Sequence, residues 1–221
     1  MRDGTAYAAK LKKAWAKHRS GATKPVIPEL QDPVHCLARA MLGDTLGDNK
    51  AGAAIDRLMS QMVDWNEVRV SSAFEIQEAM DGAIPEGIEL CQRLKHALQA
   101  IFDCENRLGL DRLRSIGRRE ARQILEQLRG VDEYVVASVV LWGLGGHAIP
   151  VNARLLKTLR EAGLVHPSAS RAEVQAFLER HISATDARAF CLTMRSFTPS
   201  KGTARRSGKS TKSRKTRKAA T

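Results

Sequence analysis

Apolar residues recur every three to four positions along most of this chain, which is the spacing that places them on one face of an α-helix. Stretches containing glycine and proline separate these segments, and such residues typically mark turns and helix ends. We therefore expect an all-α fold. The segments predicted to be helical are residues 5–18, 33–44, 49–62, 71–81, 86–108, 117–128, 134–145, 152–162, 171–181 and 184–196.

The most specific pattern lies in residues 125–157, LEQLRGVDEYVVASVVLWGLGGHAIPVNARLLK. It predicts a helix, a tight turn at Arg129–Val131, an apolar helix, a glycine stop and a new helix beginning at Asn152. Gly130 can adopt the left-handed backbone that a tight turn needs, and the Asp132 carboxylate can accept hydrogen bonds from the first N–H groups of the following helix. The stretch is thus predicted to form a helix-hairpin-helix with an exit loop.

Positive charge is concentrated at the carboxyl-terminal end. Of the formal net charge of +12, nine units come from the lysines and arginines of residues 201–221, which contain no acid, so residues 1–200 carry only +3. This segment has few apolar side chains, so we expect it to be disordered alone and to bind phosphates without reading sequence; a merely solubilising end is the alternative. The residues expected to contact nucleic acid there are Arg205, Arg206, Lys209, Lys212, Arg214, Lys215, Arg217 and Lys218.

The sequence offers no pattern typical of a metal site. The four cysteines lack C-x-x-C spacing, and the six histidines lack ligand spacing, so we expect no metal and cysteines that act as small buried apolar residues in a reducing compartment. No run approaches the ~20 apolar residues of a membrane span, and the amino terminus lacks an apolar signal core. We therefore expect a soluble intracellular protein that makes no contact with membranes.

Two motifs match a known family. The first is the hairpin, in which Leu128-Arg129-Gly130-Val131 is followed by small and apolar residues, a glycine turn and Pro150-Val151-Asn152. The second is Asp32–Thr45, DPVHCLARAMLGDT, followed by Asn49-Lys50-Ala51. Together they resemble the helix-hairpin-helix DNA glycosylase superfamily, and endonuclease III in particular. The resemblance covers roughly residues 30–197 and implies a two-lobed all-α fold with a disordered basic tail.

The resemblance implies one lobe over residues 31–147, a second lobe from residues 1–30 together with 148–198, and the tail over 199–221. It also implies a double-stranded DNA partner and a role in base-excision repair. We expect a monomer in the cytoplasm that is associated with the nucleoid, or a nuclear protein if the source is a eukaryote. Endonuclease III relatives often carry a four-cysteine iron–sulfur loop after the last helix; that loop is absent here, so we expect no iron–sulfur cluster.

At two positions the chain departs from the family's catalytic residues. Counted without gaps, Tyr134 stands where bifunctional members carry the lysine that attacks the sugar, so lyase activity is not expected. Asn152 stands where the well-known members share an aspartate that supports the positive transition state. Losing one such electrostatic contact costs ~2.7–4 kcal/mol in a comparable site. Because asparagine caps helices about as well as aspartate, we expect Asn152 to keep the helix start but not the carboxylate chemistry.

The resemblance also places candidate DNA contacts in the hairpin and in the loop after residue 43. Hairpin N–H groups would face a phosphate, assisted by neighbouring cations. The candidate DNA contacts in and near the hairpin are Gly130, Val131, Arg129, Arg154 and Lys157. Asp132 and Glu133 would compete with the phosphate for the same donors. Thr45 stands where relatives carry the residue that fills the gap left by a flipped base, and Asp44 and Asp48 beside it would repel DNA if they lie at the interface.

Three hypotheses stay open on sequence alone. The first is a DNA-binding protein with weak or absent base-excision and lyase chemistry. The second is an active monofunctional DNA glycosylase that uses another carboxylate, for which the candidates are Asp44, Asp48, Asp132 and Glu133. The third is a protein-interaction module that only its tail tethers to DNA.

Overall fold

The computed structural model describes residues 4–19, 25–80 and 87–196. The predicted disordered tail over 199–221, with its candidate DNA contacts from Arg205 to Lys218, lies outside the described residues.

The described residues form helices and no strands, so the expected all-α fold is confirmed for this part of the chain. Most predicted helices begin and end within one or two residues of their observed limits. The elements are α1 (Gly4–Arg19), α2 (Pro33–Leu46), α3 (Asp48–Gln61), α4 (Trp65–Val70), α5 (Ala73–Ala79), α6 (Gly87–Glu105), the 3-10 helix η1 (Asp111–Arg114), α7 (Arg118–Gln127), α8 (Glu133–Ser138), the π-helix η2 (Val139–Gly143), α9 (Ala153–Glu161), α10 (Arg171–His181) and α11 (Ala184–Ser196). None of the described helices is long and apolar enough to cross a membrane.

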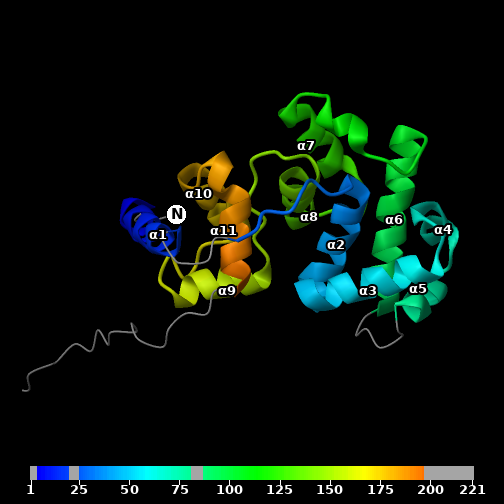
Figure 1. Ribbon diagram of the computed structural model, residues 1–221, viewed down its shortest axis with the longest axis horizontal. Coiled ribbons are helices and arrows are strands. Elements are labelled where there is room, and N and C mark those ends of the chain that lie inside the picture. Colours follow the sequence, from blue (N-terminus) through cyan, green and yellow to red (C-terminus); the bar gives the residue numbers. More distant parts are fainter. Residues whose placement is uncertain (1–3, 20–24, 81–86, 197–221) are drawn as a thin grey trace, which may run out of the picture.

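The helices form two groups that lie side by side (Figure 1). The larger group contains α2 to α8, and the smaller contains α1 and α9 to α11. The chain crosses between the groups twice, before α2 and after η2. This arrangement agrees with the expected two-lobed fold, while the residue limits given above for each lobe stay a prediction.

Helix α2 is the centre of the larger lobe. It contacts α3, α6, α8 and η2, and its residues Leu37 and Leu42 are fully buried. Its start is fixed locally, because the Asp32 carboxylate accepts a hydrogen bond from the His35 N–H at 2.7 Å and Pro33 occupies the first turn, where it lacks no needed donor. In the smaller lobe, Phe190 of α11 is buried against α1.

The predicted hairpin turn is confirmed. Gly130 has a left-handed backbone with φ of +86°, and a Cβ atom there would lie 3.0 Å from the Arg93 carbonyl oxygen of α6. Asp132 caps α8 as expected, because its Oδ1 accepts a hydrogen bond from the Val135 N–H at 2.9 Å. Two features therefore require glycine at position 130: the left-handed backbone conformation and the close approach of α6.

Several features of the larger lobe differ from the prediction, among them the 3-10 helix η1, which was not expected. Helix α4, capped by Asp64, forms in a stretch where no helix was expected. The apolar helix predicted over residues 134–145 ends as an α-helix at Ser138 and continues as the π-helix η2, in which the Leu144 N–H donates to the Val139 carbonyl at 3.0 Å. A π-helix widens the turn by one residue and often occurs beside functional sites. Here it places Trp142 against the space between the lobes.

Candidate active site at the lobe interface

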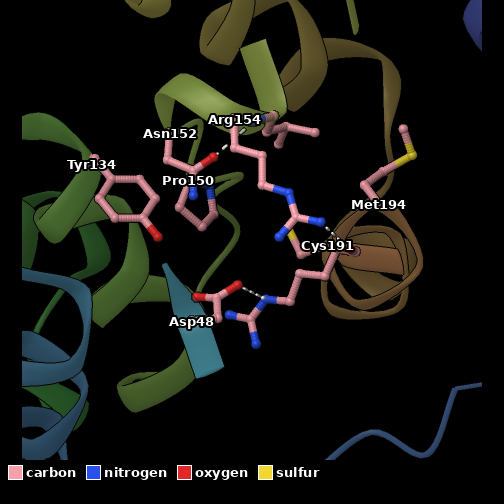
Figure 2. Close-up of a pocket in the computed structure, with 9 residues that line it drawn as sticks. Asp48, Tyr134, Pro150, Asn152, Arg154, Cys191 and Met194 are labelled. Carbon is pink, nitrogen blue, oxygen red and sulfur yellow. Dashed lines mark hydrogen bonds and ion pairs between the residues drawn. The ribbon is translucent and has the colours of Figure 1, made fainter. Parts of the chain in front are cut away.

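Two adjoining cavities lie where the lobes meet, and both are lined by Asp48, Tyr134 and Arg195. The smaller cavity, of about 40 Å³, is shown in Figure 2. The larger one, of about 160 Å³, extends toward α2 and η2. The other residues lining the smaller cavity are Pro150, Asn152, Arg154, Leu155, Cys191 and Met194. The structure therefore brings the two positions singled out from the sequence, Tyr134 and Asn152, into one site.

Asn152 performs the capping role that was expected for it. Its backbone is extended, and its Oδ1 accepts a hydrogen bond from the Leu155 N–H at 2.8 Å, which begins α9. The Asn152 side chain is a neutral amide, so it adds no negative charge to the cavity. The helix start is preserved at this position without a charge that could stabilise a cationic sugar.

Tyr134 is buried at the start of α8, and Figure 2 shows its hydroxyl pointing into the space between Asn152 and Asp48. Burial, followed by the negative charge of Asp48, raises the pKa of the Tyr134 phenol to about 12, although Arg195 and a hydrogen bond with Asn152 act in the opposite direction. The phenol therefore stays protonated at neutral pH. It can donate a hydrogen bond in the cavity, but it cannot act as a ready nucleophile.

The cysteines that line the cavities are no better suited to attack a sugar. Burial raises the pKa of the Cys191 thiol in the smaller cavity and of the Cys36 thiol in the larger cavity to about 12 each. A thiol acts as a nucleophile only as its thiolate, which is scarce at neutral pH for both residues. No lysine lines either cavity in the described part of the chain. The described lining residues therefore include no lysine whose amine could act as the nucleophile of a lyase reaction.

The loop predicted after residue 43 is reduced to Gly47, since Asp44 lies in the last turn of α2 and Asp48 is the first residue of α3. Each of these two acids pairs with an arginine of the smaller lobe. Asp48 Oδ2 lies 3.2 Å from Arg195 Nε, with side chains 23% and 39% exposed respectively. Asp44 Oδ2 lies 3.3 Å from Arg171 Nη1. Asp44 and Asp48 were expected to repel DNA phosphates if they lay at the interface, and in the structure each of the two charges is paired with an arginine. The sequence carried no signal for these pairs, since their members lie far apart in the chain.

Of the acids considered as replacement carboxylates, Asp48 alone lines the cavities among the described residues. Asp44 faces Arg171, and its Oδ1 is buried without a hydrogen-bond partner in the described part of the chain. Asp132 Oδ1 accepts the hydrogen bond that caps α8, and its Oδ2 lies 3.8 Å from Arg93 Nη2. Glu133 is exposed on α8. The structure therefore groups Asp48 with Tyr134 and Asn152, and it separates the other acids from them.

The candidate DNA contacts in the described part of the chain lie on several elements, beginning with the hairpin. Arg129 is exposed, and Val131 is partly buried with its N–H already donated to the Leu128 carbonyl at 3.2 Å. The Val135 N–H is likewise taken by Asp132. The hairpin therefore presents fewer free N–H groups to a phosphate than its motif implied, because acids and carbonyls of the turn already accept from them.

Three further candidates lie outside the hairpin. Thr45 is exposed near the end of α2, and Arg154 is exposed on α9, where its Nη2 lies 3.4 Å from the Arg195 carbonyl oxygen at the smaller cavity. Lys157 is exposed one turn later, and its Nζ lies 4.0 Å from a Glu161 carboxylate oxygen. Solvent screens such a pair, so Lys157 remains able to meet a phosphate. No group of three or more histidine, cysteine or acidic residues in the described ranges could hold a metal.

No protein-family model matches the chain, and no curated protein sequence is significantly similar to it. Solved structures are similar in fold. A trapped covalent intermediate of endonuclease III with DNA has a TM-score of 0.66 at 16% identity, over 88% of this chain and 85% of that one. The 8-oxoguanine glycosylase/lyase of Clostridium acetobutylicum bound to double-stranded DNA has a TM-score of 0.67 at 16% identity, over 88% and 69% of the two chains.

A thermostable thymine-DNA glycosylase is similar as well, with a TM-score of 0.59 at 14% identity over 86% of this chain and 83% of that one. These proteins differ in their named substrates but share one architecture. The likeness covers 86–88% of this chain in all three cases. The resemblance inferred from the two sequence motifs is confirmed at the level of the fold: this chain has the two-lobed, all-α fold of the helix-hairpin-helix DNA glycosylases.

Proposed function

We propose that this protein binds double-stranded DNA, accommodates an extrahelical nucleotide between its lobes, and has weak or absent base-excision and lyase activity. The observation that carries the proposal is the chemistry of the cavity lining. Asn152 provides a helix cap in place of a charge, and Asp48 is paired with Arg195. An excision site needs a fixed negative charge or an activated nucleophile near the sugar. In the free protein both are missing.

Two observations support the DNA partner. Several solved structures of the same fold are complexes with DNA. The nine lysines and arginines of residues 201–221 would add affinity that depends on salt and is independent of sequence. We place the protein, as a monomer, at chromosomal DNA in a repair-like context, with hairpin contacts from Gly130 and Arg129 and further phosphate contacts from Arg154 and Lys157.

A second candidate function is monofunctional base excision with Asp48 as the acid. The observation that favours it is that Asp48 lines both cavities and lies near the Tyr134 hydroxyl. This function requires Arg195 to leave Asp48 when DNA binds, because a paired carboxylate cannot support a developing positive charge at full strength. The ion pair is partly exposed, and such pairs typically contribute less than about 1 kcal/mol, so the rearrangement is energetically accessible.

A base-excision assay separates these functions. Duplexes carrying single oxidised, alkylated, deaminated or mismatched bases are incubated with the natural chain, with Asn152→Asp, with Asp48→Asn, and with a full-length variant whose eight predicted tail contacts are serine. We expect no excision by the natural chain and detectable excision by Asn152→Asp, since aspartate restores the charge and keeps the cap.

Each other outcome has a distinct meaning. Excision by the natural chain that Asp48→Asn abolishes would replace our proposal with the second candidate. Excision by the natural chain that survives Asp48→Asn would contradict both, because no other acid lines the cavities in the described part of the chain. Loss of all duplex binding in the serine-tail variant, at every salt concentration tested, would show that the folded lobes do not bind DNA and would refute the proposed function.

A further inference from the structure

Apart from the segment over residues 201–221, the net positive charge of the chain resides in helix α1. This helix contains five lysines and arginines and no acid. Residues 1–200 carry a net charge of +3, so the residues up to 200 that lie outside α1 sum to −2. Attraction to a polyphosphate comes from the cations that face it. Outside α1, residues 1–200 therefore supply no net attraction to DNA.

Three lysines of α1 lie in a row on one side of the helix. Lys10, Lys13 and Lys17 recur at spacings of three and four residues, which places them one above the other along the helix, and all three are exposed. The same side carries Ala6 and Ala9, which are also exposed. We call Lys10, Lys13 and Lys17 the lysine row; it spans roughly 10 Å along the helix axis.

The contacts of α1 within the protein do not account for the lysine row. No ion pair joins Lys10 or Lys13 to an acid in the described part of the chain. Lys10 Nζ lies 5.4 Å from the centre of the Tyr7 ring, a contact that leaves its charge in place. Cations in the last turn of a helix offset the negative end of its dipole, but Lys10 and Lys13 lie before that turn.

The opposite side of α1 attaches the helix to the smaller lobe. Leu11 is buried, and the Trp15 and Phe190 rings lie with their centres 5.3 Å apart. Lys12 is directed toward α10, since burial and then the charge of Lys12 lower the pKa of His181. The lysine row therefore faces away from the lobe. Figure 1 shows α1 at one end of the molecule, with α10 and α11 between it and the larger lobe.

The surroundings of the lysine row favour a polyphosphate over other anionic partners. A helix that binds a membrane surface inserts its apolar face among the lipids, but the apolar face of α1 is already packed against the protein. A protein interface is usually centred on large apolar or aromatic side chains, and the row is accompanied only by Ala6 and Ala9. A line of ammonium groups without such a centre suits phosphates, which lysine binds as a point charge.

We propose that the lysine row of α1 is a second double-stranded DNA-binding surface, separate from the hairpin, that contacts backbone phosphates without reading sequence. This inference rests on the proposed function, from which it takes its partner, and it adds a site at the far end of the smaller lobe. The row and the segment over residues 201–221 then supply attraction that the remaining residues lack.

Lysine footprinting on the full-length natural chain tests the site directly. The protein is acetylated with and without a saturating duplex of about 30 base pairs, roughly 100 Å long, and the rate at each lysine is measured by mass spectrometry. We expect the duplex to slow acetylation of Lys10, Lys13 and Lys17 by roughly three-fold or more, because an ammonium held against a phosphate stays protonated and covered. Lys12, on the other side of α1, and Lys95 of α6 should keep their rates.

A triple variant measures the number of phosphate contacts. Lys10→Gln, Lys13→Gln and Lys17→Gln together remove the row's charge at exposed positions and keep good helix formers. Each lost phosphate contact changes the slope of log binding constant against log salt by about 0.9, so the slope should become shallower by roughly 2–3. The matched control combines Arg57→Gln, Lys95→Gln and Arg107→Gln, which remove the same charge from the larger lobe. We expect a change below about 1 there, because salt screens distant charges.

The outcomes separate this inference from the proposed function. Protection of Lys157 on α9 without the lysine row would overturn the inference and leave the proposed function standing. Protection of the row without Lys157 would support the inference and contradict the DNA contact proposed for α9. Protection of neither would contradict both.

Three other results would also overturn the inference. The first is protection of Lys12 and Lys95 equal to that of the row, and the second is an equal slope change in the two triple variants. The third is protection of the row by phosphatidylglycerol vesicles but not by the duplex, which would identify a lipid-binding surface instead.

Discussion

The hairpin turn makes a quantitative prediction about Gly130. In the variant Gly130→Ala, the new residue must keep a φ of +86° and place its Cβ atom 3.0 Å from the Arg93 carbonyl oxygen. The first requirement costs roughly 1–2 kcal/mol for an L-residue in the left-handed region. The second forces α6 or the turn to move, and such overpacking typically costs about 1–3 kcal/mol. We therefore expect the free energy of unfolding to fall by roughly 2–5 kcal/mol.

Gly163, which follows α9, provides the matched control. It also has a left-handed backbone, with φ of +63°, but a Cβ atom there would meet no atom within 4 Å. Gly163→Ala therefore carries the backbone cost alone, and we expect a loss of only about 1–2 kcal/mol. The difference between the two variants isolates the close approach of α6 to the turn.

Urea unfolding followed by far-ultraviolet circular dichroism measures both variants. With a denaturant slope of about 2 kcal/mol/M, the extra loss in Gly130→Ala lowers the midpoint by roughly 0.5–1.5 M beyond that of Gly163→Ala. Equal losses in the two variants would refute the close approach to Arg93. A loss below about 0.5 kcal/mol in both would refute the left-handed conformations themselves, since alanine is otherwise the more stable residue.

Three further predictions follow from the described side chains. In Asn152→Ala the cap of α9 is lost and the free energy of unfolding should fall by about 1 kcal/mol, whereas Asn152→Asp should remain near the natural value; thermal unfolding measures both, and equal stability of all three would contradict the cap. A thiol reagent at pH 8 should label one cysteine quickly and three only after unfolding, because burial raises the pKa of the latter thiols to about 12, 11 and 12; the fast residue is Cys104 and the slow ones are Cys36, Cys91 and Cys191. The Arg112 guanidinium lowers the pKa of Glu105 by hydrogen bonding, so the stability that this pair contributes is present above the unfolded pKa of about 4.3 and is lost as the pH falls through the folded pKa. The variant Glu105→Gln should therefore be less stable than the natural chain at pH 7 and should lose less stability on acidification. Parallel plots of unfolding free energy against pH for the two proteins would contradict this.

The local features of the fold could be predicted because their causes lie within a few residues of each other. Gly130, Asp132 and Asn152 each act on the turn or helix start that contains them, and all three were placed correctly. Helix α4 was missed although Asp64 caps it, because its six residues are too few to establish an apolar period. The π-helix η2 was also missed, since a continuous apolar run gives no indication of where the turn widens.

The partners of Asp44 and Asp48 could not be predicted, because nothing near either residue in the sequence indicates which arginine will pair with it. Arg171 and Arg195 contact these acids only when the smaller lobe packs against the larger one. Charge balance in a cleft is a property of the assembled lobes, so sequence reasoning can name the charged residues but not their net effect.

Asn152 allows two roles of one side chain to be considered separately. The resemblance places an aspartate at this position, where one side chain serves two purposes: its oxygen caps a helix, and its charge faces the substrate sugar. The amide of Asn152 keeps the first purpose, with a hydrogen bond of 2.8 Å to the Leu155 N–H, and removes the second. Because asparagine and aspartate cap helices about equally well, we expect an exchange between them at position 152 to change stability little. Because the cap and the charge are separable in this way, Asn152→Asp adds one negative charge to the cavity and keeps the cap. The base-excision activity of this variant, compared with that of the natural chain, therefore measures what that charge alone contributes.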